Sequence, residues 1–230
     1  MDKGATEHTS KNFMTKIEQI EWAIHLAKQE KSRLTPEVLA LEGMSSPKVR
    51  HLYNNLGSIS TSYFEVGSWK GASFVSTMFG NEQLKGVAVD NWSEFNPDGK
   101  VAAEFADNAR KFIKSDRWEG VRDDCWRVKN LSFPLTKVLV PDLYLFDGGH
   151  SFEDHRKAVT HFFPMMADQF VFIVDDFSHP DFHAVKEGTL AGLSDVKDQY
   201  KVVKDWELWE EGEGSVRWWN GLFIALIERI

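Results

Sequence analysis

The stretch YFEVGSWKGASF, residues 63–74, is the part of the sequence that decides the fold. It starts as a short apolar run, carries Glu65 near the end of that run, and continues through Gly67 and Gly71 into residues with helical spacing. Glycines at these positions allow a sharp turn and a close approach of the backbone to a ligand. The stretch therefore predicts a strand, a tight turn and a helix, the first unit of an α/β fold.

The same pattern recurs along the chain. Short runs rich in β-branched and aromatic residues end in an acidic residue or a glycine, and stretches with helical spacing follow them. Such runs are typical of parallel strands that helices bury on both faces, so a doubly wound, Rossmann-like α/β sheet is expected. The predicted strands span residues 63–66, 86–89, 120–122, 143–146 and 170–174, and the predicted helices span residues 71–79, 100–114, 152–166 and 182–193.

The N-terminal part of the chain departs from this alternation. Residues 1–12 are polar and predict a disordered leader. Further on, a threonine and a serine each stand directly before a proline, which places a capping oxygen and then a proline at a helix start. We therefore expect an N-terminal helical cap over residues 13–56 and the α/β domain over residues 57–230.

The C-terminal part departs from the alternation in another way. Residues 200–209 and 216–230 both look like strands, and the acidic, glycine-containing segment between them is too short for a crossover helix. They predict an antiparallel hairpin, which brings the mostly parallel sheet to seven strands. Four tryptophans bracket the turn of this hairpin and predict cross-strand aromatic pairs, namely Trp206, Trp209, Trp218 and Trp219.

Composition excludes several classes of protein. The chain has 27 Lys+Arg against 35 Asp+Glu, and the net charge of -8 gives no positive field to attract nucleic acid. Cys125 is the single cysteine, so no intramolecular disulfide can form. The polar N-terminus and the short apolar runs predict neither a signal peptide nor a membrane span. We expect a cytoplasmic protein without nucleic-acid or membrane partners, and the sequence leaves its oligomeric state open.

Acidic residues stand at the ends of the first two predicted strands. Glu65 precedes the glycine turn and Trp69 takes the place of a middle glycine, so the turn lacks the dinucleotide-binding fingerprint and would repel a pyrophosphate. Asp90 ends the second strand, where doubly wound folds hold the hydroxyls of a ribose. A cationic adenosine cofactor therefore suits this edge of the sheet.

At this point the sequence resembles the class I S-adenosylmethionine-dependent methyltransferases. The residues 65–71, Asp90, Asp147 and the terminal antiparallel pair carry the resemblance, which covers roughly residues 57–230. It implies that S-adenosylmethionine lies along the ends of the first four strands, with the adenine beside Asp124 and either Cys125 or Trp126. The implied cofactor-binding residues are Glu65, Gly67, Ser68, Trp69, Gly71, Asp90, Asn91, Trp92, Asp124, Cys125 and Asp147. For Trp69 and Trp92, filling the core is an equally good interpretation.

Three carboxylates follow the fourth and fifth predicted strands. Asp147 ends one strand and Asp175-Asp176 ends the next, and the ends of adjacent parallel strands lie close together. Carboxylates that close repel one another unless a cation lies between them, and hard oxygen ligands suit Mg²⁺ or Ca²⁺. The pattern is similar to that of the catechol-type and macrocin-type metal-dependent O-methyltransferases, which implies a divalent metal held by these three aspartates.

His150 is the first candidate for a catalytic base. The catechol-type enzymes carry a lysine at this place, three residues after the first proposed metal ligand, so the histidine is more similar to the sugar-modifying branch. A neutral imidazole can accept a hydroxyl proton near neutral pH. Ser151 and Asp154 form a capping-box pattern, so His150 also fits a purely structural position before a helix. His179 is the second candidate.

The predicted function is methyl transfer from S-adenosylmethionine to a hydroxyl of a small molecule, assisted by a divalent metal and a histidine base. A nicotinamide-dependent oxidoreductase is one alternative, since Asp90 fits either cofactor, although Trp69 and the three aspartates argue against it. A non-catalytic scaffold that keeps the methyltransferase fold is the other. The sequence does not identify the acceptor.

Overall fold

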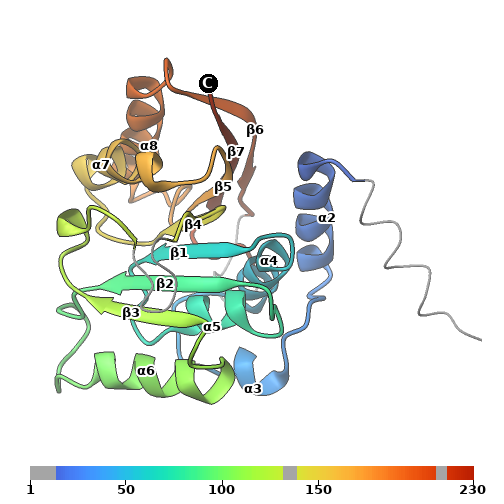
Figure 1. Ribbon diagram of the computed structural model, residues 1–230, viewed down its shortest axis with the longest axis vertical. Helices are drawn as coiled ribbons and strands as arrows, with labels where there is room; N and C mark the ends of the chain where they lie inside the picture. The colour runs from blue at the N-terminus through green and yellow to red at the C-terminus, as the bar shows by residue number, and fades with distance from the viewer. Residues whose placement is uncertain (1–13, 132–138, 211–216) are drawn as a thin grey trace, which may run out of the picture.

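The computed structural model describes residues 14–131, 139–210 and 217–230 (Figure 1). Its centre is a seven-stranded sheet in the order β3-β2-β1-β4-β5-β7-β6. Strands β1 to β5 run parallel to one another, and β7 runs antiparallel to both β5 and β6. The strands are β1 Ser62–Val66, β2 Lys85–Asp90, β3 Trp118–Arg122, β4 Leu143–Phe146, β5 Gln169–Val174, β6 Tyr200–Leu208 and β7 Leu222–Arg229.

Helices cover both faces of the sheet. Successive residues of a strand point to opposite faces, so Tyr63 packs with α2, α4, α5 and α6 whereas Phe64 packs with α7 and α8. Every residue of β1 is buried, as expected of a central parallel strand. The helices are α2 Lys16–Lys28, α3 Pro36–Leu39, α4 Pro47–Gly57, α5 Ala72–Met78, α6 Val101–Phe112, α7 Phe152–Phe162 and α8 His183–Asp195, with 3₁₀ turns at Cys125–Arg127 and Phe163–Met165.

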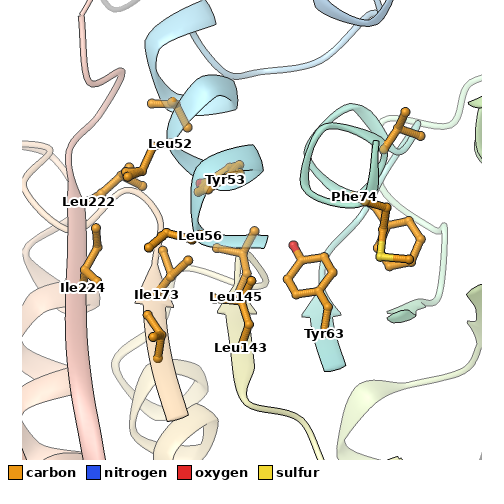
Figure 2. Close-up of a cluster of buried hydrophobic side chains, with 14 of the residues drawn as sticks. Leu52, Tyr53, Leu56, Tyr63, Phe74, Leu143, Leu145, Ile173, Leu222 and Ile224 are labelled. Carbon is orange, nitrogen blue, oxygen red and sulfur yellow. The ribbon is translucent and has the colours of Figure 1, made fainter. Parts of the chain in front are cut away.

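The N-terminal helices share a hydrophobic core with the sheet. Thr15 and Glu18 form a capping box at the start of α2, and Ser46 accepts a hydrogen bond from Val49 N at the start of α4. Thr35 makes no such bond, so the proline alone marks the start of α3. Helix α4 is buried from residue 49 to residue 57, and Figure 2 shows it lying over the strands β1, β4, β5 and β7. This burial fixes the helix against the sheet.

The predicted strands and helices are present, with one displacement near the C-terminus. Strand β7 begins at Leu222 instead of residue 216, because Arg217–Asn220 form a turn. Gly221 ends that turn at φ +88°, and a Cβ there would lie 2.6 Å from Ser178 Cβ. Trp218 and Trp219 are therefore outside the strand, and the predicted cross-strand pairs with them do not form.

Residues 1–12, predicted as a disordered leader, lie outside the described part of the chain. Within the described residues, none of the helices combines the length and the apolar character needed to cross a membrane. After β3, at one edge of the sheet, the chain returns past β2 and β1 and forms β4 on the other side of β1. The direction in which strands are added to the sheet therefore reverses between β1 and β4. In open α/β sheets ligands bind at such a reversal, outside the carboxyl ends of the strands.

Candidate active site

A cavity of about 580 Å³ lies at this reversal, outside the carboxyl ends of β1 to β5. This volume is within the range of small-molecule sites. The loops after these five strands form most of its wall, and α4 and the turn before β7 complete it. Of the predicted site residues, those that line it are Gly67, Ser68, Trp69, Asp90, Asn91, Asp124, Cys125, Asp147, His150, Asp175 and Asp176.

The turn after β1 brings the backbone close to β4. Gly67 has φ +84°, and a Cβ there would lie 1.8 Å from the carbonyl oxygen of Asp147, so this position requires glycine. Gly71 begins α5 at φ +85° and does not line the cavity, because its Cα faces the ring of Phe105. Of the two glycines, Gly67 is the one that shapes the wall of the cavity.

Glu65 does not line the cavity. It is completely buried below the turn, where its carboxylate accepts hydrogen bonds from the Tyr63 hydroxyl and, at 2.8 Å, from Ser73 Oγ. Burial raises the pKa of Glu65 to about 7, against the opposing effect of these hydrogen bonds. Its surroundings are those of a structural carboxyl group.

Asp90 organises the two loops that follow β1 and β2. Its Oδ2 accepts a hydrogen bond from Trp69 N at 2.8 Å and its Oδ1 accepts one from Trp92 N at 2.6 Å. Trp92 itself turns into the core against Phe105, and its indole N–H donates to Trp69 O at 2.7 Å. Trp92 therefore fills the core and does not line the cavity.

The residues predicted to lie beside an adenine follow β3. Asp124 caps the 3₁₀ turn by accepting a hydrogen bond from Trp126 N at 3.0 Å. Cys125 is partly buried, and its burial together with the charge of Asp124 raises the pKa of the thiol to about 12. Asp124, Cys125 and Trp126 all belong to the cavity wall. The thiol stays protonated, so Cys125 contributes an apolar surface there.

The three aspartates after β4 and β5 converge as predicted. Burial raises the pKa of Asp147 and of Asp175, and the neighbouring carboxylates, Asp176 among them, raise both further. One ligand atom each from Asp147, His150 and Asp176 lies within 4.8 Å of the others. The cluster that can hold a metal thus comprises Asp147 and Asp176 of the predicted aspartates together with His150, whereas Asp175 is not part of it.

His150 stands at the centre of this cluster. Its Nε2 is 2.8 Å from Asp176 Oδ2, and this contact raises the pKa of His150. Its ring stacks on Phe182 with centroids 4.6 Å apart. His179 does not line the cavity, and its Nδ1 instead accepts a hydrogen bond from Asp181 N at 3.1 Å. The geometry favours His150 over His179 as a group that meets a ligand.

Several residues of the cavity carry no signal in the sequence. Asn220 Nδ2 donates to Asp176 Oδ1 at 2.5 Å from the turn before β7. Tyr53 on α4 is 1% exposed, lines the cavity, and has a hydroxyl without a hydrogen-bond partner among the described residues. Trp219, Glu94 and Phe95 also line it. Only the fold brings these distant segments together.

Strained backbone is concentrated around the cavity. Trp69, Phe95, Asp176 and Trp219 line it and have φ of 42°, 47°, 57° and 53°. Residues other than glycine adopt this region at a cost, and such residues cluster at functional sites. The strain supports the assignment of this cavity as the active site.

The cavity wall is strongly acidic. None of the described residues that line it is a lysine or an arginine. Eight of them are acidic, namely Asp90, Glu94, Asp123, Asp124, Asp147, Asp154, Asp175 and Asp176. A cationic ligand or a metal ion is the natural complement of such a wall.

Comparisons with known proteins agree with this geometry. Residues 64–177 match a family described as a methyltransferase domain. The chain is similar to the O-methyltransferase TomG from Streptomyces achromogenes in complex with S-adenosylmethionine, at 17% identity and a TM-score of 0.57, covering 96% of this chain and 94% of that one. It is also similar to an O-methyltransferase from Bacillus cereus in complex with S-adenosylhomocysteine, at 13% identity and a TM-score of 0.55, covering 96% of each chain. No curated protein matches the sequence.

Proposed function

We propose that this chain, whose residues 64–177 match a methyltransferase domain, uses S-adenosylmethionine to methylate a hydroxyl of a small molecule with the help of a divalent cation. The observation that carries this proposal is the cluster of Asp147, His150 and Asp176 at the cavity, in which the two carboxylates are the proposed metal ligands and His150 is the proposed base. Methyl transfer is a direct displacement, so the protein contributes mainly by aligning the acceptor oxygen with the methyl carbon and the sulfur.

The residues of the cluster fit a cation. Without one, the charges of Asp175 and Asp176 raise the pKa of Asp147, and the charge of Asp176 raises the pKa of Asp175. Their hard oxygens suit Mg²⁺ or Ca²⁺. When bound, such an ion would orient the acceptor hydroxyl and lower its pKa.

His150 is the proposed proton acceptor. Its ring is held between Phe182 and Asp176, and its side chain is 43% exposed, so a substrate can reach it. Asp176 favours the protonated imidazole and would stabilise it after proton transfer. Replacing His150 with glutamine tests this role, because loss of turnover with unchanged Mg²⁺ affinity is expected. A tenfold weaker Mg²⁺ affinity would make His150 a ligand and not a base.

The cofactor is proposed to lie along the loops after β1, β2 and β3. Gly67 and Ser68 line the part of the cavity proposed for its methionine end. Asp90 keeps acceptor capacity for a ribose hydroxyl beyond its two backbone hydrogen bonds. Asp124, Cys125 and Trp126 form the wall proposed for the adenine. Calorimetry with S-adenosylhomocysteine and with NAD tests this assignment. Binding of NAD alone would favour the oxidoreductase.

The decisive experiment measures S-adenosylhomocysteine formation with a panel of hydroxylated acceptors in the presence of Mg²⁺ and of a chelator. Turnover that requires Mg²⁺ is the expected result. Equal turnover in the chelator contradicts the metal proposal and leaves the methyltransferase intact. Cofactor binding with no turnover of any acceptor would favour the non-catalytic scaffold.

A further inference from the structure

The charge of the cavity wall exceeds what the proposed cofactor and metal require. Of its eight acidic residues, Asp123 alone has a lysine or arginine partner among the described residues, with Arg127 at 3.7 Å. A sulfonium cofactor and a divalent ion together carry fewer positive charges than these carboxylates carry negative ones. Part of the negative charge is therefore left to face the acceptor.

Two of the surplus carboxylates line the cavity together with the proposed base. They are Glu94 and Asp154, whose charges add to that of Asp176 in raising the pKa of His150. Asp154 already accepts a hydrogen bond from Ser151 Oγ at 2.6 Å. Glu94 is exposed and has no hydrogen-bond or ion-pair partner within the described residues. Glu94 is thus the carboxylate available to a ligand.

The cavity wall near Glu94 carries aromatic rings, because Phe95 follows it in the chain and Trp69 Nε1 donates to Phe95 O at 3.3 Å. Phe95 is 66% exposed and Met44 is 49% exposed, and both line the cavity. Trp69 and Trp219 also belong to its wall. Aromatic faces beside a carboxylate attract organic ammonium groups, because the ring faces are electron-rich. The combination is unsuited to a phosphate or a carboxylate.

The hydroxyl of Tyr53 indicates a ligand independently of the charge of the cavity wall. Tyr53 projects from α4 toward the sheet in Figure 2, and its hydroxyl is buried without a partner in the described structure. An unsatisfied buried hydroxyl is costly, and a ligand oxygen beside Asp147 and Asp175 would satisfy it. A ligand that fills the cavity would therefore place an oxygen inside and its other end at the rim.

We propose that the methyl acceptor is an amine-bearing hydroxyl compound whose ammonium group is held at the rim by Glu94 and the neighbouring aromatic rings. Acceptors that carry phosphate, coenzyme A or a carboxylate are disfavoured by the same carboxylates. This inference rests on the proposed methyl transfer and adds the charge class of the acceptor.

Matched acceptors test the inference. One series is 4-(2-aminoethyl)catechol, 4-ethylcatechol and 3-(3,4-dihydroxyphenyl)propionate, and the other is glucosamine, glucose and glucuronate. We expect the ammonium member of the reacting series to have a kcat/KM about tenfold above that of the carboxylate member, with the neutral member between them, since each charge pair near a surface contributes a few-fold. An equal or better carboxylate member overturns the inference and leaves the methyltransferase proposal standing.

Binding separates the two proposals. Calorimetry on protein loaded with S-adenosylhomocysteine and Mg²⁺ should show tighter binding of the ammonium members. That result without any methyl transfer supports the inference while counting against the proposed function. No binding of either ammonium member contradicts the inference.

Glu94→Gln tests the residue that carries the preference. It should lower the ratio of kcat/KM between the ammonium and neutral members about three- to fivefold, mainly through KM. Glu187→Gln is the matched control, because Glu187 is exposed on α8 and does not line the cavity. This control should leave the ratio unchanged. An unchanged ratio in Glu94→Gln would show that Glu94 does not hold the ammonium group.

Discussion

The carboxylate near the end of β1 and those after β4 and β5 lie at the same edge of the sheet in opposite surroundings. Glu65 is buried and accepts hydrogen bonds from Tyr63 and Ser73. Asp147 and Asp176 face the cavity, where other carboxylates and one histidine are their neighbours. Burial away from the cavity with nearby donors, and not the position at a strand end, therefore decides whether a carboxylate is structural or faces a ligand.

The largest effect on turnover is expected from removing a carboxylate that faces the cavity. Asp147→Ala should lower Mg²⁺-dependent turnover about 1,000-fold, because a bound metal contributes several kcal/mol to a transition state. Affinity for S-adenosylhomocysteine, measured by calorimetry, should stay nearly the same. Residual turnover close to that of the natural protein would place Asp147 outside the reaction.

The buried carboxylate should affect stability instead. Its pKa of about 7 lies above the ordinary value of 4.5, so the folded state holds the proton more tightly than the unfolded chain. The free energy of unfolding should therefore fall by about 3 kcal/mol as pH rises from 4.5 past 7. Asp90, the charged group that also acts on Glu65, adds to the shift.

Glu65→Gln removes this titration. Urea unfolding at pH 5 and pH 8 should show that the variant loses about 3 kcal/mol less stability than the natural protein over this interval. Asp147 and Asp175 stay in both proteins, but the charge of Glu65 contributes to their raised pKa values, so the variant also loses that smaller part of their pH dependence. The same pH dependence in both proteins would mean that Glu65 is ionised when folded.

A smaller effect is expected from removing Asn220, which positions the cavity-facing carboxylate of Asp176. Asn220→Ala removes the hydrogen bond to Asp176 Oδ1 and should weaken Mg²⁺ binding about 10- to 100-fold, as loss of a group that orients a metal ligand does. Titration with Mg²⁺ measures this affinity, and cofactor affinity is the internal control. Unchanged Mg²⁺ affinity would show that Asp176 needs no such support.

The smallest effect is expected at Tyr53. Tyr53→Phe removes a buried hydroxyl that lacks a partner, so the ligand-free protein should keep its stability or gain up to about 1 kcal/mol. Tyr144→Phe is the matched control, because the Tyr144 hydroxyl donates to Ala158 O at 3.2 Å and its loss should cost about 1 kcal/mol. Urea unfolding distinguishes the two, and equal losses would indicate an unseen partner for Tyr53.

The sequence predicted well what depends on neighbouring residues in the chain. Gly67 and the aspartates after β4 and β5 could be placed because a tight turn requires glycine and adjacent parallel strands end together. His150 followed from its distance to Asp147. The family match over residues 64–177 covers all of these positions.

Other features depend on contacts between distant segments. Whether Trp92 meets the cavity or the core depends on Phe105, and Glu65 is structural because the packing of the sheet and helices buries it completely. The later start of β7 depends on the contact of Gly221 with Ser178. No spacing along the chain reveals such contacts.

The link between Asn220 and Asp176 also has a consequence for the order of assembly. The two residues are 44 positions apart, and β7, which follows Asn220, lies between β5 and β6. Because a ribosome delivers the N-terminal residues first, the loops after β1 to β3 can form while Asp176 still lacks this support. During synthesis Asn220 therefore reaches the proposed metal site later than the residues of the proposed cofactor side of the cavity.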